Sequence, residues 1–212
     1  MMSAVFEINQ KFIKESVDKL DKADIDFDNI PDMQFYMEQL TDFLNKNAGG
    51  TKRADTSDNQ ADVLTKAMIN NYTRNGILNP PDKKKYNREH IVLLLMINQL
   101  KNILTIKDIK KLFAPILKNM NTTEVDDTII SLKDIYTTFL KLKDDEYKDA
   151  AADFDAKFSI IKEKTSQISD EKNQDLAEAF MIVMMLVAEA NIAKRLAENI
   201  IDNLPSIMQR NN

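Results

Sequence analysis

The sequence predicts a mostly helical protein with one short β-hairpin. Only three glycines occur in 212 residues, and Gly76 is the only one after Gly50, so the turn glycines of a β-rich fold are missing. Apolar residues recur at helical spacing along most of the chain. Pro80-Pro81, which forbids helix, precedes three lysines where a hairpin fits. These observations favour helices joined by short connections.

Two helices are expected before residue 50. The first covers residues 4–20, and its apolar residues have helical spacing: Val5, Ile8, Phe12, Ile13, Val17 and Leu20. The second begins at Pro31, a residue suited to a first helical turn, and ends at Gly49-Gly50. Its apolar stripe is Met33, Tyr36, Met37, Leu40, Phe43 and Leu44. The polar residues 51–60 then predict a loop.

A third helix is expected over residues 62–75, and Gly76 can take the left-handed conformation that closes it. The residues that it should bury are Val63, Ala67, Met68 and Tyr72. Pro80-Pro81 then forces an extended turn, which leads into a short lysine-rich wing.

Two more helices should follow the wing. Asn87 is placed to cap the first, which runs through an apolar stretch and should be buried. Thr105 is placed to cap the second, with Asp108 in the capping-box position. Pro115 should kink or end this second helix.

The pattern changes after residue 118. Apolar residues step alternately by four and three, as in helical bundles and coiled coils: Val125, Ile129, Leu132, Tyr136 and Phe139, then Tyr147, Ala151, Phe154, Phe158, Ile161, Thr165 and Ile168. The final helix, about residues 170–203, is apolar nearly all round, so it should be buried inside a bundle or at a subunit contact. We therefore expect an N-terminal helix with its linker, a central domain, and a C-terminal helical bundle that also oligomerises: residues 1–30, 31–118 and 119–212.

Basic residues gather in the centre of an acidic chain. The whole chain has 29 Lys and Arg against 34 Asp and Glu, yet residues 62–118 hold 11 basic and 4 acidic residues. A local positive surplus is what attraction to nucleic-acid phosphates requires. An ordinary solvated lysine face is the alternative interpretation.

Several spacings in this region occur together. Tyr72 and Arg74 precede Gly76-Ile77-Leu78, Lys84-x-Tyr86 closes the wing, and apolar positions follow at Ile91, Ile97, Leu100, Leu104, Ile109 and Leu112. Over residues 64–113 this resembles the N-terminal domain of MerR-type regulators. More closely, residues 31–118 look like an uncharacterised bacterial family, a domain of unknown function, that shares the MINNYT, GIL-PPDKKKYNREHI and LTIKDIKKL blocks. The resemblance implies a winged helix-turn-helix fold that binds double-stranded DNA and regulates transcription as a homodimer.

The expected DNA-binding residues lie on the 62–75 helix and around the 80–87 wing: Lys66, Asn70, Asn71, Arg74, Lys83, Lys84, Lys85 and Arg88. On the helix, the asparagines would read base edges and the cations would contact phosphates. Asn70 stands where MerR-type helices carry an arginine, which changes the base preference. The wing lysines would hold the DNA backbone beside the groove. A polar helix face with a solubilising hairpin tip is the alternative.

Other candidate residues have structural explanations. His90 is the only histidine and is better explained as a surface or capping residue than as a ligand. Acidic groups at expected helix starts complement helix dipoles: Asp126-Asp127 and Asp144-Asp145-Glu146. A methionine cluster would suit core or dimer packing, with a ligand pocket as the alternative: Met181, Met184 and Met185. We expect no enzyme, cofactor or metal, because cysteine, a nucleophile–base pair and a glycine-rich loop are all missing.

Two functional hypotheses follow. The first is a MerR-like, homodimeric DNA-binding regulator of transcription. The second is a protein-interaction module that uses the apolar C-terminal helix without binding DNA. The longest uncharged apolar run, residues 179–188, is too short to span a membrane, and no secretion leader is evident, so we expect a soluble cytoplasmic protein. The sequence leaves open whether a small-molecule effector binds the C-terminal region.

Overall fold

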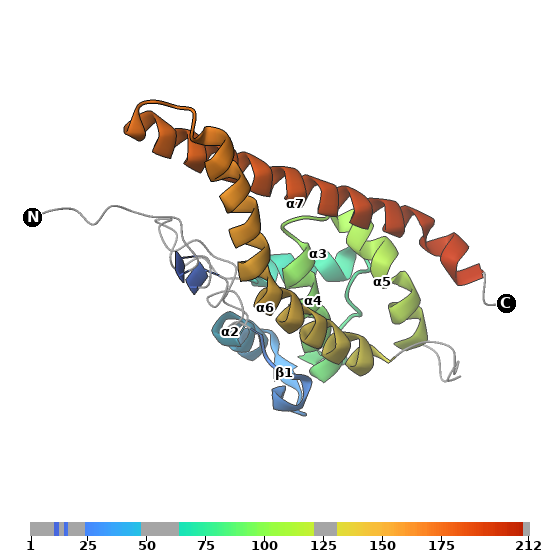
Figure 1. The fold of residues 1–212 in the computed structure, drawn as a ribbon. Coiled ribbons are helices and arrows are strands. Elements are labelled where there is room, and N and C mark those ends of the chain that lie inside the picture. The colour runs from blue at the N-terminus through green and yellow to red at the C-terminus, as the bar shows by residue number, and fades with distance from the viewer. Residues whose placement is uncertain (1–10, 13–14, 17–23, 48–63, 121–130, 210–212) are drawn as a thin grey trace, which may run out of the picture. The chain divides into compact units, whose positions relative to one another are not determined.

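The computed structural model describes residues 11–12, 15–16, 24–47, 64–120 and 131–209. In this part the chain is mostly helical, with six α-helices, one 3-10 helix and a two-stranded antiparallel sheet (Figure 1). The chain divides into two compact units. The hairpin unit comprises residues 1–22 and 142–196, and the larger unit comprises residues 23–141 and 197–212. Helices α6 (Leu132–Thr165) and α7 (Glu171–Gln209) contribute to both units.

The elements of the larger unit follow one another with short strands between helices. Their order is η1 (Phe27–Asn29), β1 (Phe35–Tyr36), α2 (Met37–Asn47), α3 (Lys66–Arg74), β2 (Lys85–Tyr86), α4 (Arg88–Leu100) and α5 (Ile106–Met120). In the antiparallel sheet, Phe35 lies opposite Tyr86 and Tyr36 lies opposite Lys85. The first turns of α6 and the last turns of α7 complete this unit.

Helix α4 supplies most of the core of the larger unit. Eight of its 13 residues are buried, including the unbroken run from His90 to Leu95. A helix with so little polar surface has to be covered on several sides. Buried residues from the surrounding elements cover it: Phe35, Leu40, Leu44, Ile69, Tyr72, Ile77, Leu78, Tyr86, Ile109, Phe113, Leu117, Tyr136 and Ile201. The prediction of a buried helix here is confirmed.

Residues 31–36 are not helical, so the prediction of a helix beginning at Pro31 is wrong. Phe35 and Tyr36 form β1, and α2 begins only at Met37. The Tyr36 backbone N–H donates to Gln39 Oε1 at 2.9 Å, which satisfies a backbone donor at the start of the helix. Phe35 is 7% exposed, and its ring centroid lies 5.5 Å from that of Phe43. Pairing with a strand 50 residues away outweighs the local helical signal.

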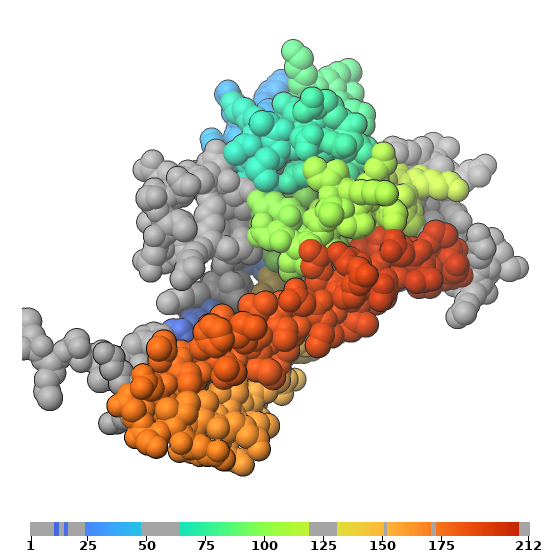
Figure 2. All heavy atoms as spheres, turned by 90° about the horizontal axis from the view of Figure 1, so that it is seen from above, coloured from blue at the N-terminus to red at the C-terminus, as the bar shows by residue number. Residues whose placement is uncertain are grey.

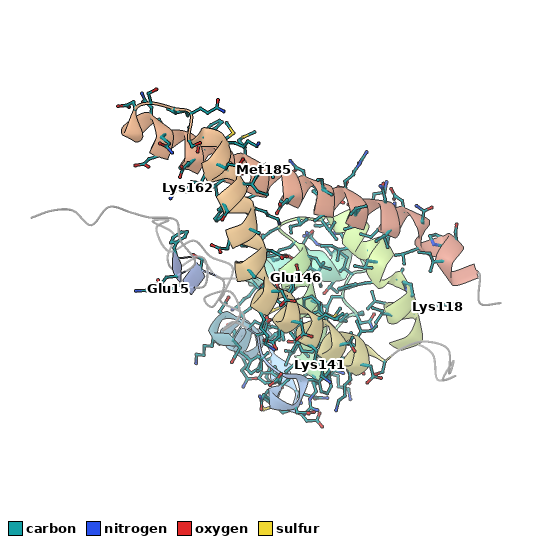
Figure 3. All side chains as sticks on the ribbon, in the orientation of Figure 1. Glu15, Lys118, Lys141, Glu146, Lys162 and Met185 are labelled. Carbon is teal, nitrogen blue, oxygen red and sulfur yellow. The ribbon has the colours of Figure 1, made fainter. Side chains whose placement is uncertain are left out.

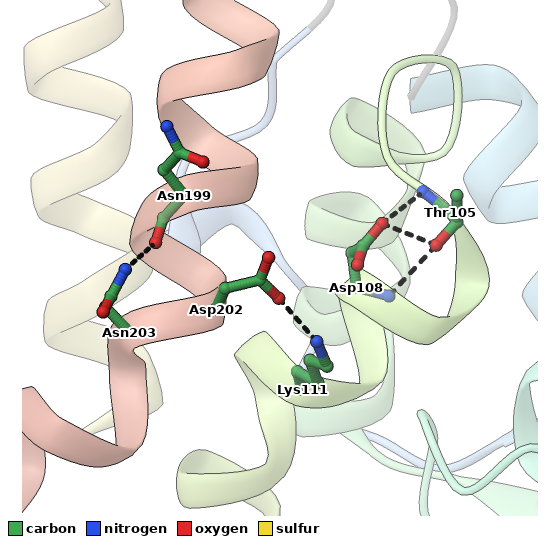
Figure 4. Close-up of polar contacts among 6 residues, drawn as sticks. All are labelled: Thr105, Asp108, Lys111, Asn199, Asp202 and Asn203. Atoms are coloured by element: carbon green, nitrogen blue, oxygen red, sulfur yellow. Dashed lines mark hydrogen bonds and ion pairs between the residues drawn. The ribbon is translucent and has the colours of Figure 1, made fainter.

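Three helix ends follow the prediction. Gly76 has φ +69°, the left-handed conformation expected after α3. Asn87 Oδ1 accepts a hydrogen bond from the His90 backbone N–H at 3.1 Å. Thr105 and Asp108 form a reciprocal capping box, in which each side chain accepts from the other residue's backbone N–H at 3.2–3.3 Å (Figure 4). These ends depend on neighbouring residues alone, which explains why the sequence predicts them.

Of the two outcomes predicted for Pro115, a kink or a helix end, the structure excludes the helix end. The helix continues through it to Met120. Phe113 and Leu117 flank the proline and are both buried in the core. Their burial offsets the backbone hydrogen bond that proline removes.

The hairpin unit consists mainly of α6 and α7, joined by residues 166–170. From Leu132 to Thr165, the two apolar seams predicted after residue 118 belong to one helix, α6, while Ile168 lies in the connection to α7. Thr165 Oγ1 donates to Glu178 Oε1 at 3.2 Å, and Lys157 Nζ lies 3.0 Å from Glu189 Oε1. The helix expected over residues 4–20 is helical where it is described, at 11–12 and 15–16. Gly49-Gly50, the loop 51–60 and residues 125–130 lie outside the described residues.

Helix α7 exposes much of its apolar surface, so the expectation that it is buried inside a bundle is not met in the described part of the chain. Leu176 is 69% exposed and Ile192 is 62% exposed. Among the described helices, the stretch Asn173–Ile207 alone is long and apolar enough to cross a bilayer, and an 18-residue window within it has a mean hydropathy of 1.8. This stretch includes Glu178 and Glu189, which form polar contacts with α6.

Candidate nucleic-acid interface

Helices α2 and α3 meet at the start of α3, although 16 undescribed residues connect them. The Asn45 side chain contacts both backbone groups of Leu64, accepting from its N–H at 3.2 Å and donating to its carbonyl at 3.5 Å. At the other end of α2, Glu38 Oε1 lies 2.8 Å from Lys66 Nζ. Residues near both ends of α2 therefore fix the start of α3, through Leu64 just before it and Lys66 in its first turn.

One side of α3 is exposed and polar. Thr65 caps the helix by accepting from the Met68 backbone N–H at 3.2 Å. Ile69 and Tyr72 face the core, which leaves a stripe at four-residue spacing on the outside: Lys66, Asn70 and Arg74. Ala67 is exposed, so the prediction that it is buried is wrong, because α3 is oriented by Leu64 and Ile69.

Asn71 is not part of this exposed stripe. It is half-buried, and its side-chain oxygen accepts from the Asn75 amide at 3.1 Å. The base-reading role predicted for Asn71 would therefore require that this contact open. Lys66 is also engaged, and the ion pair lowers the pKa of Glu38 through the hydrogen bond and the charge of Lys66. Both partners of the pair are exposed, so a phosphate can compete for Lys66 at little cost.

The lysine wing is a tight turn with an unusual backbone. The Lys85 backbone N–H donates to the Asp82 carbonyl at 2.8 Å and closes the turn. Both central residues have positive φ, 48° at Lys83 and 66° at Lys84. Asn-Gly ordinarily occupies such positions, because a left-handed conformation costs other L residues roughly 1–2 kcal/mol each. The turn exposes two cations in a conformation that glycine would adopt without strain.

The structure separates Lys85 and Arg88 from the tip of the wing. Lys85 lies in β2, is half-buried, and places Nζ 5.7 Å from the Tyr36 ring centroid. The Arg88 side chain is 26% exposed, with its guanidinium carbon 5.3 Å from the Phe27 ring centroid and 4.0 Å between its Nη2 and an Asp32 carboxylate oxygen. Lys133 Nζ lies 5.0 Å from the same Phe27 ring. Arg88 thus packs beside η1, a contact between distant residues that no sequence pattern indicates.

His90 links the wing to the start of α4. Its Nδ1 accepts from the Asn87 backbone N–H at 3.2 Å, completing a capping box, so the capping role is confirmed. It is 8% exposed, so it is not a surface residue, and its ring packs edge-on against Tyr86 at 5.4 Å between centroids. Burial lowers the pKa of His90, and the backbone groups of Asn79 and Pro80 oppose this only in part. Nε2 is buried without a hydrogen-bond partner among the described residues.

Comparison with known proteins places this region in a family. A family model described as a domain of unknown function, DUF1836, matches residues 25–139, more than half of the chain. The chain belongs to this family. No curated protein and no solved structure matches it. The DUF1836 match runs from just before η1 into the first turns of α6, so it includes α2, α3 and the wing. The likeness to MerR-type regulators stays a prediction.

The described part of the larger unit also contains a small cavity. It has a volume of about 10 Å³, and its lining includes Ile25, Leu95, Tyr136 and Leu140. Such a volume holds about one water molecule, which is too little for an organic effector. Tyr136 donates to the Ile25 carbonyl at 2.7 Å, and burial raises the pKa of its hydroxyl. Within the described residues, no three His, Cys, Asp or Glu side chains gather to hold a metal ion.

Substitutions that relieve the backbone strain of the wing turn should stabilise the protein. The double substitution Lys83→Asn/Lys84→Gly should raise the free energy of unfolding by about 1 kcal/mol, measured from urea denaturation with an unchanged slope. Lys83→Ala/Lys84→Ala is the matched control, since alanine is strained at positive φ and should give no such gain. Equal stability of both variants would show that the turn is not strained.

His90 predicts a loss of stability in mild acid. The neutral imidazole is favoured in the fold, so the unfolded chain takes up the proton first. Stability is therefore complete above the ordinary pKa of 6.5 and falls as the pH drops toward the lowered folded value. His90→Gln can keep the capping box and should remove this component of the pH dependence. Parallel thermal melts of both proteins between neutral and acidic pH test this. Parallel curves would contradict it.

Proposed function

We propose that this DUF1836 protein is a DNA-binding regulator of transcription with a MerR-like winged helix-turn-helix. In this proposal α2 and α3 are the helix pair, α3 is the recognition helix, and the Asp82–Lys85 turn is the wing. The observation that supports it most is the turn itself. Two exposed lysines occupy left-handed positions at a cost in stability, and such strain is typical of functional sites.

The roles of the α3 residues follow from their exposure. Asn70 is exposed and can form two hydrogen bonds with an adenine edge in the major groove. Arg74, exposed in the last turn, and Lys66, in the first turn, would bind phosphates on either side of it. The wing lysines Lys83 and Lys84 would hold the backbone next to the groove. Arg88 and Lys85 would contribute less, because both already pack against aromatic rings.

We further propose that the regulator is a homodimer joined through α7. Exposed apolar side chains on this helix step by four, three and four, the spacing of a coiled-coil seam: Leu176, Phe180, Val183 and Val187. On the helix this stripe lies away from Ile182, which is buried, and from Glu189, which pairs with Lys157 of α6. Two copies would bury the stripes against each other, and a dimer presents two recognition helices to two half-sites. Glu178 and Glu189, held by α6, favour this cytoplasmic protein contact over insertion in a membrane.

The same exposed stripe is the observation that favours the second candidate function, a protein-interaction module. In that case a different protein would cover α7, and α3 would make no DNA contact. The two candidates share the α7 surface and differ in α3 and the wing, so DNA binding separates them.

DNA binding should depend steeply on salt. Lys83→Ala/Lys84→Ala should weaken binding to genomic DNA fragments and reduce the slope of log affinity against log salt by about two. Lys85→Ala is the control and should change the slope less, because its ammonium group lies against Tyr36. Fluorescence anisotropy at several salt concentrations measures both effects. If the unaltered protein binds no fragment at low salt, the regulator proposal is wrong.

The dimer should depend on the apolar stripe of α7. Phe180→Glu/Val187→Glu places like charges opposite each other in a paired seam and should convert a dimer to a monomer in sedimentation analysis. Met185→Glu/Ile192→Glu adds the same charge at exposed positions outside the stripe and should leave the dimer intact; Met185 is labelled in Figure 3. A monomeric unaltered protein would rule out the homodimer and favour a different partner.

A further inference from the structure

Helix α5 has one apolar side and one basic side. Ile109, Phe113 and Leu117 are buried against the core. The exposed side carries four lysines and one alanine, and no acid: Lys107, Lys110, Lys111, Ala114 and Lys118. Asp108, the acid of this helix, instead engages Thr105 in the capping box (Figure 4). The lysines extend over roughly 16 Å of helix axis, at 1.5 Å per residue.

The four lysines are not equivalent. Lys111 Nζ lies 2.6 Å from Asp202 Oδ1, and this contact holds the end of α7 on α5 within the larger unit (Figure 4). The hydrogen bond to Asp202 raises the pKa of Lys111. Lys107, Lys110 and Lys118 form no ion pair with any other described residue. The presence of a lysine at position 111 is therefore explained by its contact with α7, whereas no such contact explains the other three lysines.

Lys110 connects this basic side to the recognition helix. A Cβ atom placed on Gly76 would lie 3.7 Å from Lys110 Nζ, so the ammonium group reaches the residue that closes α3. Gly76 comes two residues after Arg74, the last residue of α3. The surfaces of α3 and α5 adjoin on one face of the larger unit, in teal and yellow-green in Figure 2. The positive surface of α3 thus continues onto α5.

We propose that Lys107, Lys110 and Lys118 form a second phosphate-binding surface, which holds duplex DNA beyond the segment that α3 reads. This inference rests on the proposed DNA binding and adds α5 to it. A lysine near a helix C-terminus also complements the helix dipole, which accounts for Lys110 beside the end of α3 and for Lys118 in the last turn of α5. It does not account for Lys107, which lies in the first turn of α5, or for the alignment of all three lysines on one exposed side. A duplex backbone offers repeated phosphates along its length and matches a row of cations.

The test compares two double substitutions of equal charge. Lys107→Gln/Lys110→Gln removes two cations of the α5 surface, and Lys141→Gln/Lys162→Gln removes two exposed lysines of α6. Lys118, Lys141 and Lys162 are labelled in Figure 3. Both variants are titrated against random-sequence duplexes of roughly one and roughly three helical turns, at several salt concentrations. If Lys107→Gln/Lys110→Gln does not fold, Lys107→Gln/Lys118→Gln replaces it, because this variant keeps the contact between Lys110 and Gly76.

On the longer duplex, the α5 variant should lose about two units of the salt slope, while the α6 variant keeps nearly the wild-type slope. On the shorter duplex the α5 variant should lose less of the slope than on the longer one, since fewer phosphates extend beyond Lys110 to the rest of α5. Equal slopes for both variants on the longer duplex overturn the α5 surface and leave the proposed function in place. No binding of the unaltered protein to either duplex at low salt overturns the proposed function and this inference together.

Discussion

The burial of α4 is the constraint on which the larger unit depends. Since most of this helix is apolar, its neighbours must cover it, and each neighbour is fixed by side chains that reach it. Ile77 and Leu78 enter the core just after α3, and Tyr86 enters it just before α4. The segment between these anchors has little freedom. Helix α3 and the wing turn are therefore held in register by the same core, a condition for the precise contact with a DNA groove that we propose.

The wing region combines two features that cost stability: lysines in a strained backbone conformation and a buried histidine. Two non-glycine residues at positive φ occur side by side at the tip of the wing, and a buried histidine with an unpaired nitrogen lies behind it. Each departure costs stability, which the apolar core of α4 offsets. A solubilising hairpin needs neither feature. This is the physical reason for preferring a functional reading of the wing over an ordinary charged surface.

Much of the helical outline, the caps and the burial of α4 could be predicted because each depends on residues within one or two turns. The Gly76 closure and the Thr105–Asp108 box are examples. Among the candidate site residues, the exposed positions on α3 also follow from helical spacing. β1 could not be predicted, because its partner is distant in sequence, and Arg88 could not be placed, because Phe27 and Asp32 lie far before it. Pro115 does not end α5, because burial of Phe113 and Leu117 in the core offsets its local effect, and burial of this kind depends on the tertiary structure.

The sequence by itself determined a helical chain, a basic segment in an acidic protein, and the family to which residues 25–139 belong. Those properties follow from the amino-acid composition and from the spacing of residues along the chain. Only the tertiary structure decided which cations share a surface, because that depends on side chains brought together from separate helices. It put Lys110 beside Gly76, engaged Lys111 with Asp202, and left the apolar stripe of α7 exposed. Residues of the same type therefore differ in their contacts and exposure, because packing against the core places each of them differently.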